Sequence, residues 1–287
     1  NHADDAEPEP NFTVREYVRA VEKAKEYIRR GDIYQVNLSQ RFETGFSGDP
    51  FSLYCRLRDA SPAPFSAYLD FGEVKILSSS PERFLLKRGD YVETRPIKGT
   101  RPRGEDARGD ASLERDLAAS AKDRAEHVMI VDLERNDLGR VCEYGSVRPS
   151  EMFSLERYST VFHLVSTVSG RLRPGTDALD CLRAAFPGGS ITGAPKIRSM
   201  EIIEELEPVK RSIYTGAIGY ISFDGNMDTS IAIRTIVIKG KKAYFQVGGG
   251  IVADSDPEAE YQETLDKARG MMAALGLKRF HGAAVSC

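Results

Sequence analysis

Hydrophobic residues recur along the chain with two different periods. Between Thr13 and Arg30 they return every three or four positions, as in a helix with one buried face, and Gly31 follows as a typical helix end. The same period predicts a longer helix from Ser112 to Asp137, and the polar residues Asp132, Glu134, Arg135, Asn136 and Asp137 are expected to make salt bridges and a helix end rather than a site. Shorter helices are predicted over residues 51–58, 177–185, 195–206 and 258–272.

Other segments alternate apolar and polar residues, which predicts half-buried strands. In residues 32–42, Tyr34, Val36 and Leu38 form an apolar side, while Gln35 begins a polar side that either faces solvent or lines a site. Asp224 and Gly225 predict a hairpin turn. Further strands are predicted over residues 65–71, 74–80, 83–88, 91–94, 159–168, 213–223, 227–239 and 242–247, and a loop over 95–104. Because strands and helices come in runs, the predicted class is α+β with mostly antiparallel sheet.

The segment from Lys242 to Met272 combines a strand, three glycines and a helix start. The run Gly248–Gly250 follows the apolar alternation of the strand, and a backbone without side chains lets another group approach closely. Asp256 and Pro257 then provide an N-cap oxygen and a first-turn residue that needs no N–H donor. The segment therefore places a helix N-terminus just after an open stretch of backbone.

Two acidic pairs with helical spacing stand out. Glu260 and Glu263 share a helix face with Lys267, and Asp123 and Glu126 repeat the three-residue spacing on the other long helix. Either pair alone is typical of a solvated helix face that offsets the helix dipole. Two pairs on two helices are what a hard divalent cation between helices requires, since one pair cannot fill its oxygen shell. The residues alone leave both interpretations open.

Four further polar residues have a structural and a functional interpretation. Lys98 lies among prolines and glycines with few carboxylates beside it, and is either a surface lysine or a nucleophile. His163 stands between apolar residues, as a hydrogen-bonded core histidine does. Thr192 precedes a predicted helix whose free N–H groups can receive a carboxylate. Arg234 interrupts an apolar strand and must therefore find an anion.

Composition narrows the class of protein. The chain has 287 residues and a net charge of −3, which argues against a nucleic-acid partner held by bulk electrostatics. Its four cysteines are widely spaced, which favours a reducing, cytoplasmic location. No apolar run approaches membrane-span length. No Gly-rich phosphate motif or Cys/His zinc spacing occurs. Residues 1–11 are expected to be a linker or tail.

Seven motifs in order resemble the chorismate-utilising enzymes. They are SPERF (80–84), PIKGTRPRG (96–104), AEHVMIVDLERNDLGR (125–140), FHLVS (162–166), GGSITGAPK (188–196), IAIRT (231–235) and GGGIVADSDPEAEYQETLDKA (248–268). The resemblance implies a chorismate-binding catalytic domain over residues 12–276, with two stacked sheets flanked by helices and an active site in the cleft between them. Residues 277–287 are then a C-terminal tail, and the family's usual N-terminal subdomain is expected to be absent from this sequence.

The resemblance also implies a metal site. Glu126 and Glu263 are expected to bind Mg2+, with Asp123 and Glu260 in support through water. Relatives often carry glutamate where this chain has Asp123, so that contact is expected to be longer.

The substrate, chorismate, carries two carboxylates. The resemblance implies that one lies on the metal and on the amides of Gly248–Gly250, and that the other is met by Arg234, Tyr214 and Lys267.

Branch membership depends on two positions. Isochorismate and salicylate synthases carry a water-activating lysine where this chain has Gln35, so the resemblance implies an ammonia-using enzyme. Anthranilate synthases typically have alanine where this chain has Lys98, whereas aminodeoxychorismate synthases have a lysine that attacks C2 of chorismate. The resemblance places His163 and Glu82 near the reacting ring, with Glu82 as the general acid. A nucleophilic Lys98 must be neutral, so a depressed pKa is expected.

The resemblance thus predicts an aminodeoxychorismate synthase component I, supplied with ammonia by a glutamine amidotransferase subunit. Anthranilate synthase component I is the alternative, and a non-catalytic scaffold that only docks an amidotransferase is a further one. No nucleic-acid or membrane partner is expected.

Overall fold

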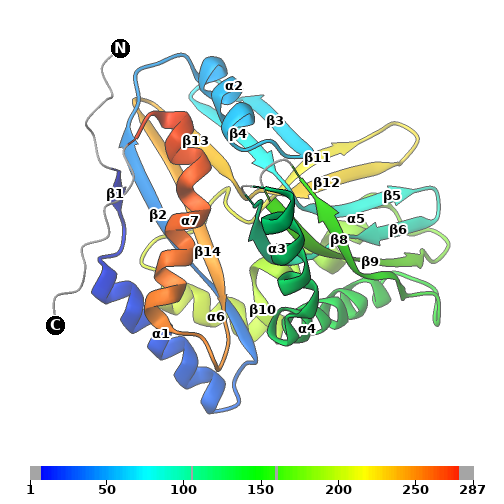
Figure 1. Ribbon diagram of the computed structural model, residues 1–287. Coiled ribbons are helices and arrows are strands. Elements are labelled where there is room, and N and C mark those ends of the chain that lie inside the picture. Colours follow the sequence, from blue (N-terminus) through cyan, green and yellow to red (C-terminus); the bar gives the residue numbers. More distant parts are fainter. Residues whose placement is uncertain (1–7, 105, 159–160, 278–287) are drawn as a thin grey trace.

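The computed structural model describes residues 8–104, 106–158 and 161–277, and within them the strands form two antiparallel sheets (Figure 1). The first has the order β1 (Glu9–Pro10), β2 (Gln35–Gly45), β14 (Lys242–Ile251), β13 (Thr235–Lys239), β4 (Val74–Ser80) and β3 (Phe65–Asp70), with β10 (Gly193–Ala194) also on β2. The second has the order β11 (Ala217–Ile221), β12 (Met227–Ile231), β5 (Arg83–Arg88), β6 (Tyr91–Thr94), β9 (Val161–Arg171) and β7 (Ile97–Pro102), with β8 (Arg148–Arg157) on β9. The predicted α+β class with two mostly antiparallel sheets is confirmed.

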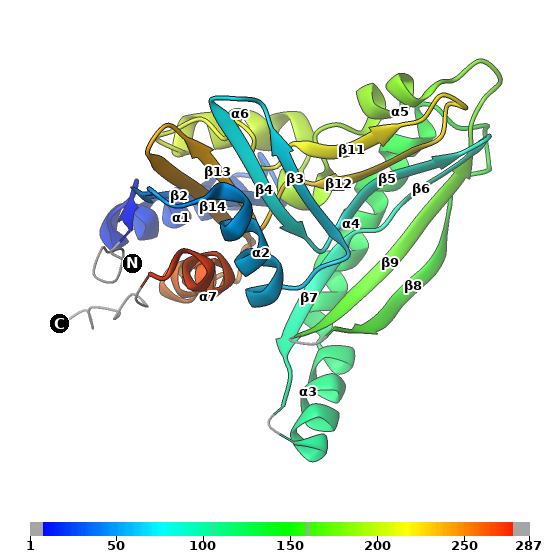
Figure 2. The ribbon, with the colours of Figure 1, turned by 90° about the horizontal axis from the view of Figure 1, so that it is seen from above.

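Helices cover both sheets (Figure 2). Along the first sheet lie α7 (Pro257–Leu275), with α1 (Val14–Arg29) and α2 (Pro50–Ala60) beside it, and α6 (Lys196–Leu206), which packs against β2. Against the second sheet lie α3 (Ala107–Ala119), α4 (Ala121–Gly139) and α5 (Ala178–Ala185); a short 3-10 turn, η1 (Gly189–Ile191), precedes β10. The predicted start of α7 is confirmed, because Asp256 accepts the Ala259 N–H at 2.9 Å and Pro257 is the first helical residue.

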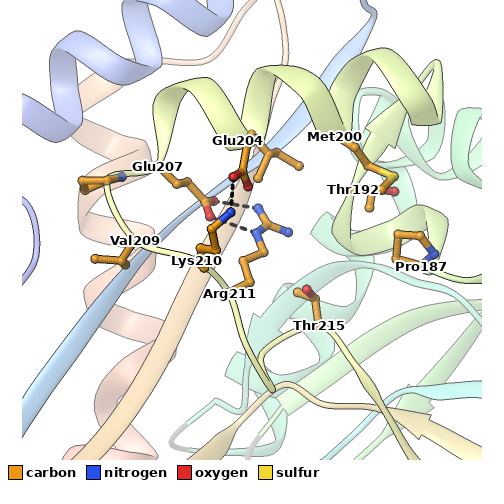
Figure 3. A pocket seen from close by; sticks show the side chains of 11 residues that line it. Pro187, Thr192, Met200, Glu204, Glu207, Val209, Lys210, Arg211 and Thr215 are labelled. Atoms are coloured by element: carbon orange, nitrogen blue, oxygen red, sulfur yellow. Dashed lines mark hydrogen bonds and ion pairs between the residues drawn. The ribbon is translucent and has the colours of Figure 1, made fainter.

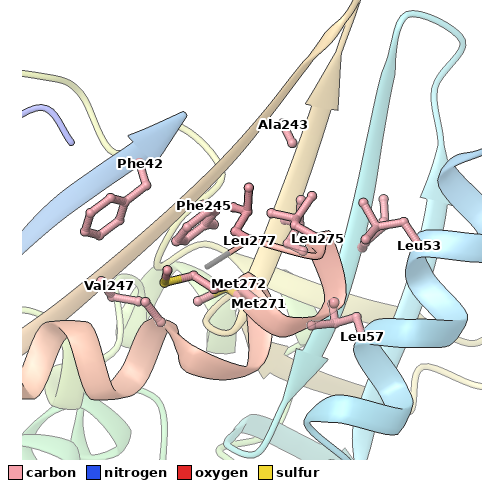
Figure 4. Close-up of a cluster of buried hydrophobic side chains, with 14 of the residues drawn as sticks. Phe42, Leu53, Leu57, Ala243, Phe245, Val247, Met271, Met272, Leu275 and Leu277 are labelled. Atoms are coloured by element: carbon pink, nitrogen blue, oxygen red, sulfur yellow. The ribbon is translucent and has the colours of Figure 1, made fainter. Parts of the chain in front are cut away.

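A hydrophobic core fixes α7 to the first sheet (Figure 4). Phe42 of β2 and Phe245 of β14 stack with ring centroids 5.2 Å apart, and Leu53 of α2 and Met272 of α7 pack in the same cluster. Burying each of these side chains contributes about 1.5–3 kcal/mol relative to exposure. The apolar side of β14 thereby holds the N-terminal half of α7 near Gly248–Gly250.

The strand predicted over residues 227–239 is wrong as a single element. It divides into β12 and β13, which belong to different sheets, and the chain crosses between them at Arg234, whose φ is 51°. The crossing from β4 to β5 runs beside it: the Ser79 N–H donates to the Arg234 carbonyl and the Ile231 N–H to the Glu82 carbonyl, each at 3.1 Å. Periodicity missed this because both halves are apolar strands.

Two more predictions are corrected. The expected loop over 95–104 contains β7, a strand with a bulge between Ile97 and Thr100 where Gly99 takes a φ of 85°. The single long helix over 112–137 is two helices meeting at Ser120, whose extended backbone ends α3 and whose hydroxyl caps α4. Short polar residues such as serine favour helix caps over helix interiors. Ser120 was therefore a local signal for a break, but the prediction followed the hydrophobic periodicity, which continues across it.

Several predicted boundaries also shift. The strand over 213–223 contracts to β11, and its first residues form a turn. Glu9 and Pro10 of the expected N-terminal tail pair with β2, while residues 1–7 of that tail, 159–160 of the β9 segment and 278–287 of the C-terminal tail lie outside the described residues. The Asp224-Gly225 hairpin is confirmed between β11 and β12. None of the helices in the described part of the chain combines the length and hydrophobicity that a membrane span requires.

Candidate active site

The three glycines of β14 form the floor of a polar site between the sheets. A Cβ atom at Gly250 would lie 2.3 Å from Gln35 Nε2 and 2.9 Å from Lys98 Nζ. One at Gly249 would lie 3.0 Å from Glu260 Oε2 and 3.5 Å from Glu263 Oε1. Side chains of three other segments therefore close directly onto this backbone, and any side chain here would displace them.

Gln35 lies on β2 next to the glycine floor. It is fully buried, so the predicted polar side of this strand lines the interior, and Val36 and Leu38 of the predicted apolar side are buried in a hydrophobic core; Tyr34, which precedes β2, is 71% exposed. Neither Gln35 Nε2 nor Oε1 has a hydrogen-bond partner among the described residues. A buried amide without partners is costly unless something binds it, so this position favours a ligand-facing role.

Lys98 projects from β7 of the second sheet toward the same floor. Burial lowers the pKa of its ammonium group, although the Glu126 carboxylate acts in the opposite direction and Lys267 adds to the lowering. Within the described residues its Nζ makes no hydrogen bond or ion pair at contact distance. The expected direction of the shift is confirmed, with burial as its main cause. A larger neutral fraction makes the amine a better nucleophile.

Glu82 sits where the chain crosses from β4 to β5. Its side chain is 5% exposed and its Oε1 accepts a hydrogen bond from Ser190 Oγ at 2.6 Å. Burial raises its pKa to about 7, and the hydrogen bond from Ser190 only partly offsets this. A carboxyl group that is still partly protonated near neutral pH is suited to general-acid chemistry.

The four predicted metal-binding carboxylates flank the site on α4 and α7. Burial raises the pKa of Glu126 against the opposing charges of Lys98 and Lys122, and the negative charges of Asp123 and Glu263 add smaller contributions in the same direction as burial. Asp123 forms an ion pair with Arg101 at 3.1 Å, and Glu260 accepts a hydrogen bond from Ser255 at 2.6 Å.

These carboxylates fit a hard cation in donor chemistry, since all are oxygen ligands and two of them repel each other. Among the described residues, no three histidine, cysteine, aspartate or glutamate side chains form a ready metal-coordinating group. Asp123 and Glu263 instead pair with cationic side chains, which a bound metal ion would have to compete with.

The cationic residues form the wall at α7. Lys267 Nζ lies 2.6 Å from Glu263 and donates to the Gly248 carbonyl at 2.8 Å. Arg234 donates to the Lys267 carbonyl, and no carboxylate pairs with it within the described residues. A Cβ at Gly248 would lie 3.0 Å from Tyr214 Oη, and burial raises the pKa of Tyr214 to about 12. The anion that Arg234 was expected to find is thus not a protein carboxylate here.

His163 lies on β9 at the side of the site. It is buried, and its Nδ1 is 2.9 Å from Thr100 Oγ1 on the paired strand β7. Burial and then the nearby Arg234 charge lower the pKa of His163 to about 4, so its ring is neutral at physiological pH. A neutral, fixed imidazole can accept or donate a hydrogen bond without adding charge.

Thr192 is the predicted residue that turns away. Its hydroxyl donates to the Gly188 carbonyl at 2.8 Å, and only its backbone carbonyl, which accepts the Asn37 N–H at 2.7 Å, joins the strand beside Gln35. It lines a separate pocket of about 370 Å³, shown in Figure 3. That pocket is lined by the end of α6 and the turn after it, including the Glu207–Arg211 ion pair, and none of the residues that meet the glycine floor lines it.

Comparison with known proteins identifies this arrangement. The family model described as chorismate binding enzyme matches residues 1–273. The chain belongs to the chorismate-binding enzymes. Its structure agrees with solved members: anthranilate synthase component I from Streptococcus pneumoniae superimposes with a TM-score of 0.85 at 43% identity, covering 92% of this chain and 59% of that one. The menaquinone-specific isochorismate synthase from Escherichia coli gives 0.81 at 25% identity, covering 94% and 63%.

Curated relatives at about 50% identity include proteins of two names. Anthranilate synthase component 1 from Aquifex aeolicus is 53% identical over 265 residues, which is 92% of this chain and 54% of the relative. Aminodeoxychorismate synthase component 1 from Escherichia coli is also 53% identical over 265 residues, covering 92% and 58%. The chain therefore spans a little more than half the length of the curated relatives it matches, and overall identity does not separate the two activities.

One buried acid of this chorismate-binding chain was missed by the sequence analysis. Glu134 of α4, expected at a salt-bridged helix end, is 5% exposed and near Glu82. Its spacing from His127, Ile130 and Val131, which are all buried, follows the helical period and places it on the buried face of α4. The neighbouring Asp137 does form the expected ion pair, with Lys196 at 2.5 Å.

Proposed function

We propose that this chain is the catalytic domain of an aminodeoxychorismate synthase component I, which converts chorismate and ammonia to 4-amino-4-deoxychorismate. The observation that carries the proposal is Lys98, an amine of lowered pKa without a paired carboxylate in the described chain, held between Gly250, Gln35 and the general-acid candidate Glu82. A relative named for this activity, at 53% identity, supports it.

The proposed reaction consists of two allylic displacements. In the first, the neutral Lys98 amine bonds to C2 of chorismate, both conjugated ring double bonds shift, and the C4 hydroxyl leaves as water after taking a proton from Glu82. In the second, ammonia bonds to C4, the two double bonds shift back and the neutral Lys98 amine is expelled from C2, while the new ammonium group at C4 gives a proton back to Glu82. The sum is chorismate plus ammonia giving 4-amino-4-deoxychorismate plus water, with the lysine regenerated.

Substrate binding is assigned to the wall at α7, which faces Lys98. Arg234, Lys267 and the Tyr214 hydroxyl supply donors for one substrate carboxylate, and the backbone amides of Gly248–Gly250 supply donors for the other. The neutral His163 ring would lie beside the cyclohexadiene without competing with these charges. The Gln35 amide would contribute its unpaired groups to the substrate or to ammonia.

Mg2+ is part of the proposal as the cofactor. Glu126 and Glu263 would hold it, with Asp123 and Glu260 in support through water. When bound, it would offset the repulsion among the protein carboxylates and neutralise the charge of one substrate carboxylate. Lys267 would then be free to leave Glu263 for the ligand.

The proposed partner is a glutamine amidotransferase subunit that supplies ammonia, because the relatives are named as a component 1. Such a complex would be cytoplasmic, in keeping with the dispersed cysteines. The second candidate function is anthranilate synthase component I, favoured by the relatives of that name at equal identity. It differs in adding the amine at C2 and eliminating pyruvate.

A product assay tests the proposal. The purified chain is incubated with chorismate, Mg2+ and ammonium, and the products are separated by liquid chromatography and identified by mass. 4-Amino-4-deoxychorismate is expected, and it should yield para-aminobenzoate only after an aminodeoxychorismate lyase is added. Anthranilate fluorescence without added lyase would establish the second candidate instead.

A further inference from the structure

Glu134 is a buried acid that the proposed reaction does not use. It lies on the inner face of α4 between Ile130 and Leu138, both of which are fully or almost fully buried. Its Oε2 is inaccessible and has no hydrogen-bond partner among the described residues. An ionised carboxylate in this position would be costly, so the group must be protonated or must share a proton with a neighbour.

The neighbour is Glu82, and both acids meet the same short turn. Glu82 accepts a hydrogen bond from Ser190 of η1 at 2.6 Å. The residue before it, Gly189, is so close to Glu134 that a Cβ there would lie 3.6 Å from Glu134 Cγ. Both acids therefore lie beside successive residues of the same three-residue turn, and the negative charge of Glu82 raises the pKa of Glu134.

The surrounding charges do not neutralise both acids. Asp137, one helical turn beyond Glu134, already takes the ammonium group of Lys196 at 2.5 Å. The Thr94 hydroxyl faces Glu134 from the end of β6, and Lys98 and Lys267 act on Glu82 from β7 and α7 without contacting it. Burial raises the pKa of Glu82 to about 7, and burial together with the Glu82 charge raises that of Glu134 to about 8.

We propose that Glu134 is a positioning residue that shares one proton with Glu82, so that Glu82 remains able to protonate the departing C4 hydroxyl at pH values where a lone carboxyl would be ionised. The link to the C4 hydroxyl rests on the proposed function; the shared proton does not. Two interacting acids lose their protons in two steps that belong to the pair. After the first proton leaves, the second is retained to higher pH and resides on Glu82 part of the time.

The shared proton is tested on the free protein by carboxyl-carbon NMR with 13C-labelled glutamate. In the wild-type chain, two glutamate signals should titrate together in two steps near neutral pH. In Glu134→Gln, which keeps the size of the side chain, the Glu82 signal should titrate in one step and finish at lower pH. An unchanged Glu82 titration in Glu134→Gln would overturn the proposal, whatever reaction the enzyme catalyses.

The role in turnover is tested by the pH dependence of kcat with chorismate and ammonium. In Glu134→Gln, the fall of kcat on the alkaline side of the pH profile should begin at lower pH, by up to about one unit. KM for chorismate should change less than about twofold. Glu134→Asp, which restores a carboxyl group, should recover part of the shift. Asp132→Asn removes a charge from the exposed side of the same helix and should leave the profile unchanged.

These outcomes separate the two proposals. Coupled titration without any aminated product would refute the proposed function and leave the shared proton intact. If kcat of Glu134→Gln falls equally at every pH and the alkaline fall of the profile stays at the same pH, Glu134 only supports the packing of α4. That result would overturn the positioning role.

Discussion

The two walls of the site treat charge differently. On the α7 wall every ionisable side chain has a partner: Lys267 holds Glu263 and the Gly248 carbonyl, and Ser255 donates to Glu260. On the opposite wall, Lys98 has no contact partner within the described residues, and Glu82 has a single hydroxyl donor. Burial shifts pKa values on both walls, but the groups of the α7 wall are held in ion pairs and hydrogen bonds, whereas burial lowers the pKa of Lys98 and raises that of Glu82 to about 7 with fewer contacts to fix them.

This difference assigns separate tasks to the walls. Fixed, hydrogen-bonded charges bind and orient an anionic ligand with little reorganisation. Groups whose pKa values lie closer to neutral pH can exchange protons and act as acid, base or nucleophile. The glycine floor of β14 brings the two walls within reach of one small molecule.

The largest expected effect is at Lys98. Lys98→Ala should abolish formation of 4-amino-4-deoxychorismate, because the proposed covalent bond to C2 is made by the Lys98 amine. Product should be measured by chromatography at saturating ammonium. Lys23→Ala, which removes an exposed lysine of α1 remote from the site, is the matched control and should stay fully active. Full activity of Lys98→Ala would remove the covalent step from the mechanism.

Glu82→Gln should come next. The amide cannot give up a proton to the leaving hydroxyl, so kcat should fall roughly 10²–10⁴-fold while chorismate binding is kept. Isothermal titration calorimetry with chorismate would measure the binding, and stopped assays the rate. A variant that loses binding but not kcat would move Glu82 from the reactive wall to the binding wall.

Gly250→Ala should have an intermediate effect on the rate, because the added methyl group would push side chains away from the glycine floor. Its Cβ would lie 2.3 Å from Gln35 Nε2 and 2.9 Å from Lys98 Nζ, so both must move. Displacing a reacting group by about 1 Å costs up to about 10²-fold in rate. Gly45→Ala, at the end of β2 where an added Cβ meets nothing within 4 Å, should be neutral. Equal kcat/KM values for the two variants would contradict the close approach.

The smallest effect is on stability and its pH dependence. The Glu82 pKa of about 7 lies above its ordinary value of 4.5, so the native state binds this proton more tightly than the unfolded state, and stability falls as pH rises from about 4.5 to about 7. Glu82→Gln removes that fall. Its free energy of unfolding relative to wild type should therefore rise between pH 4 and pH 8 by on the order of 3 kcal/mol. Urea titrations at both pH values check this, and a constant difference would refute the buried titration.

Sequence patterns predicted the fold class and the start of α7 because each depends on local chemistry, such as the cap at Asp256 and the alternation of β14. Of the residues that the resemblance named, Gln35, Lys98, Tyr214, Glu260, Glu263 and Lys267 meet the glycine floor, whereas Thr192 does not. Its side chain turns onto Gly188, a contact that no local pattern specifies. The crossing at Arg234 was also missed, because hydrophobic periodicity reports that a segment is buried and does not say in which sheet.

Glu134 was overlooked for a related reason. The run of charges from residue 132 to residue 137 resembles a solvated helix end, and its members differ only in which side of α4 they occupy. Asp132 pairs with Arg135 in solvent, whereas Glu134 points inward. Reading the buried face from His127 and Val131 onward would have separated them.

The adjacent crossings at Glu82 and Arg234 also determine where this chain can change in length. All strands of the second sheet lie between β4 and β13 in the sequence, and β4 and β13 both belong to the first sheet. The only strand of the first sheet within this described segment is β10. The β11–β12 hairpin, with the fully exposed Phe223 beside its turn, projects at the far end of that segment (Figure 2). Insertions at this hairpin would extend the molecule outward. They would leave the two crossings between the sheets unchanged, and with them the positions of Glu82 and Arg234.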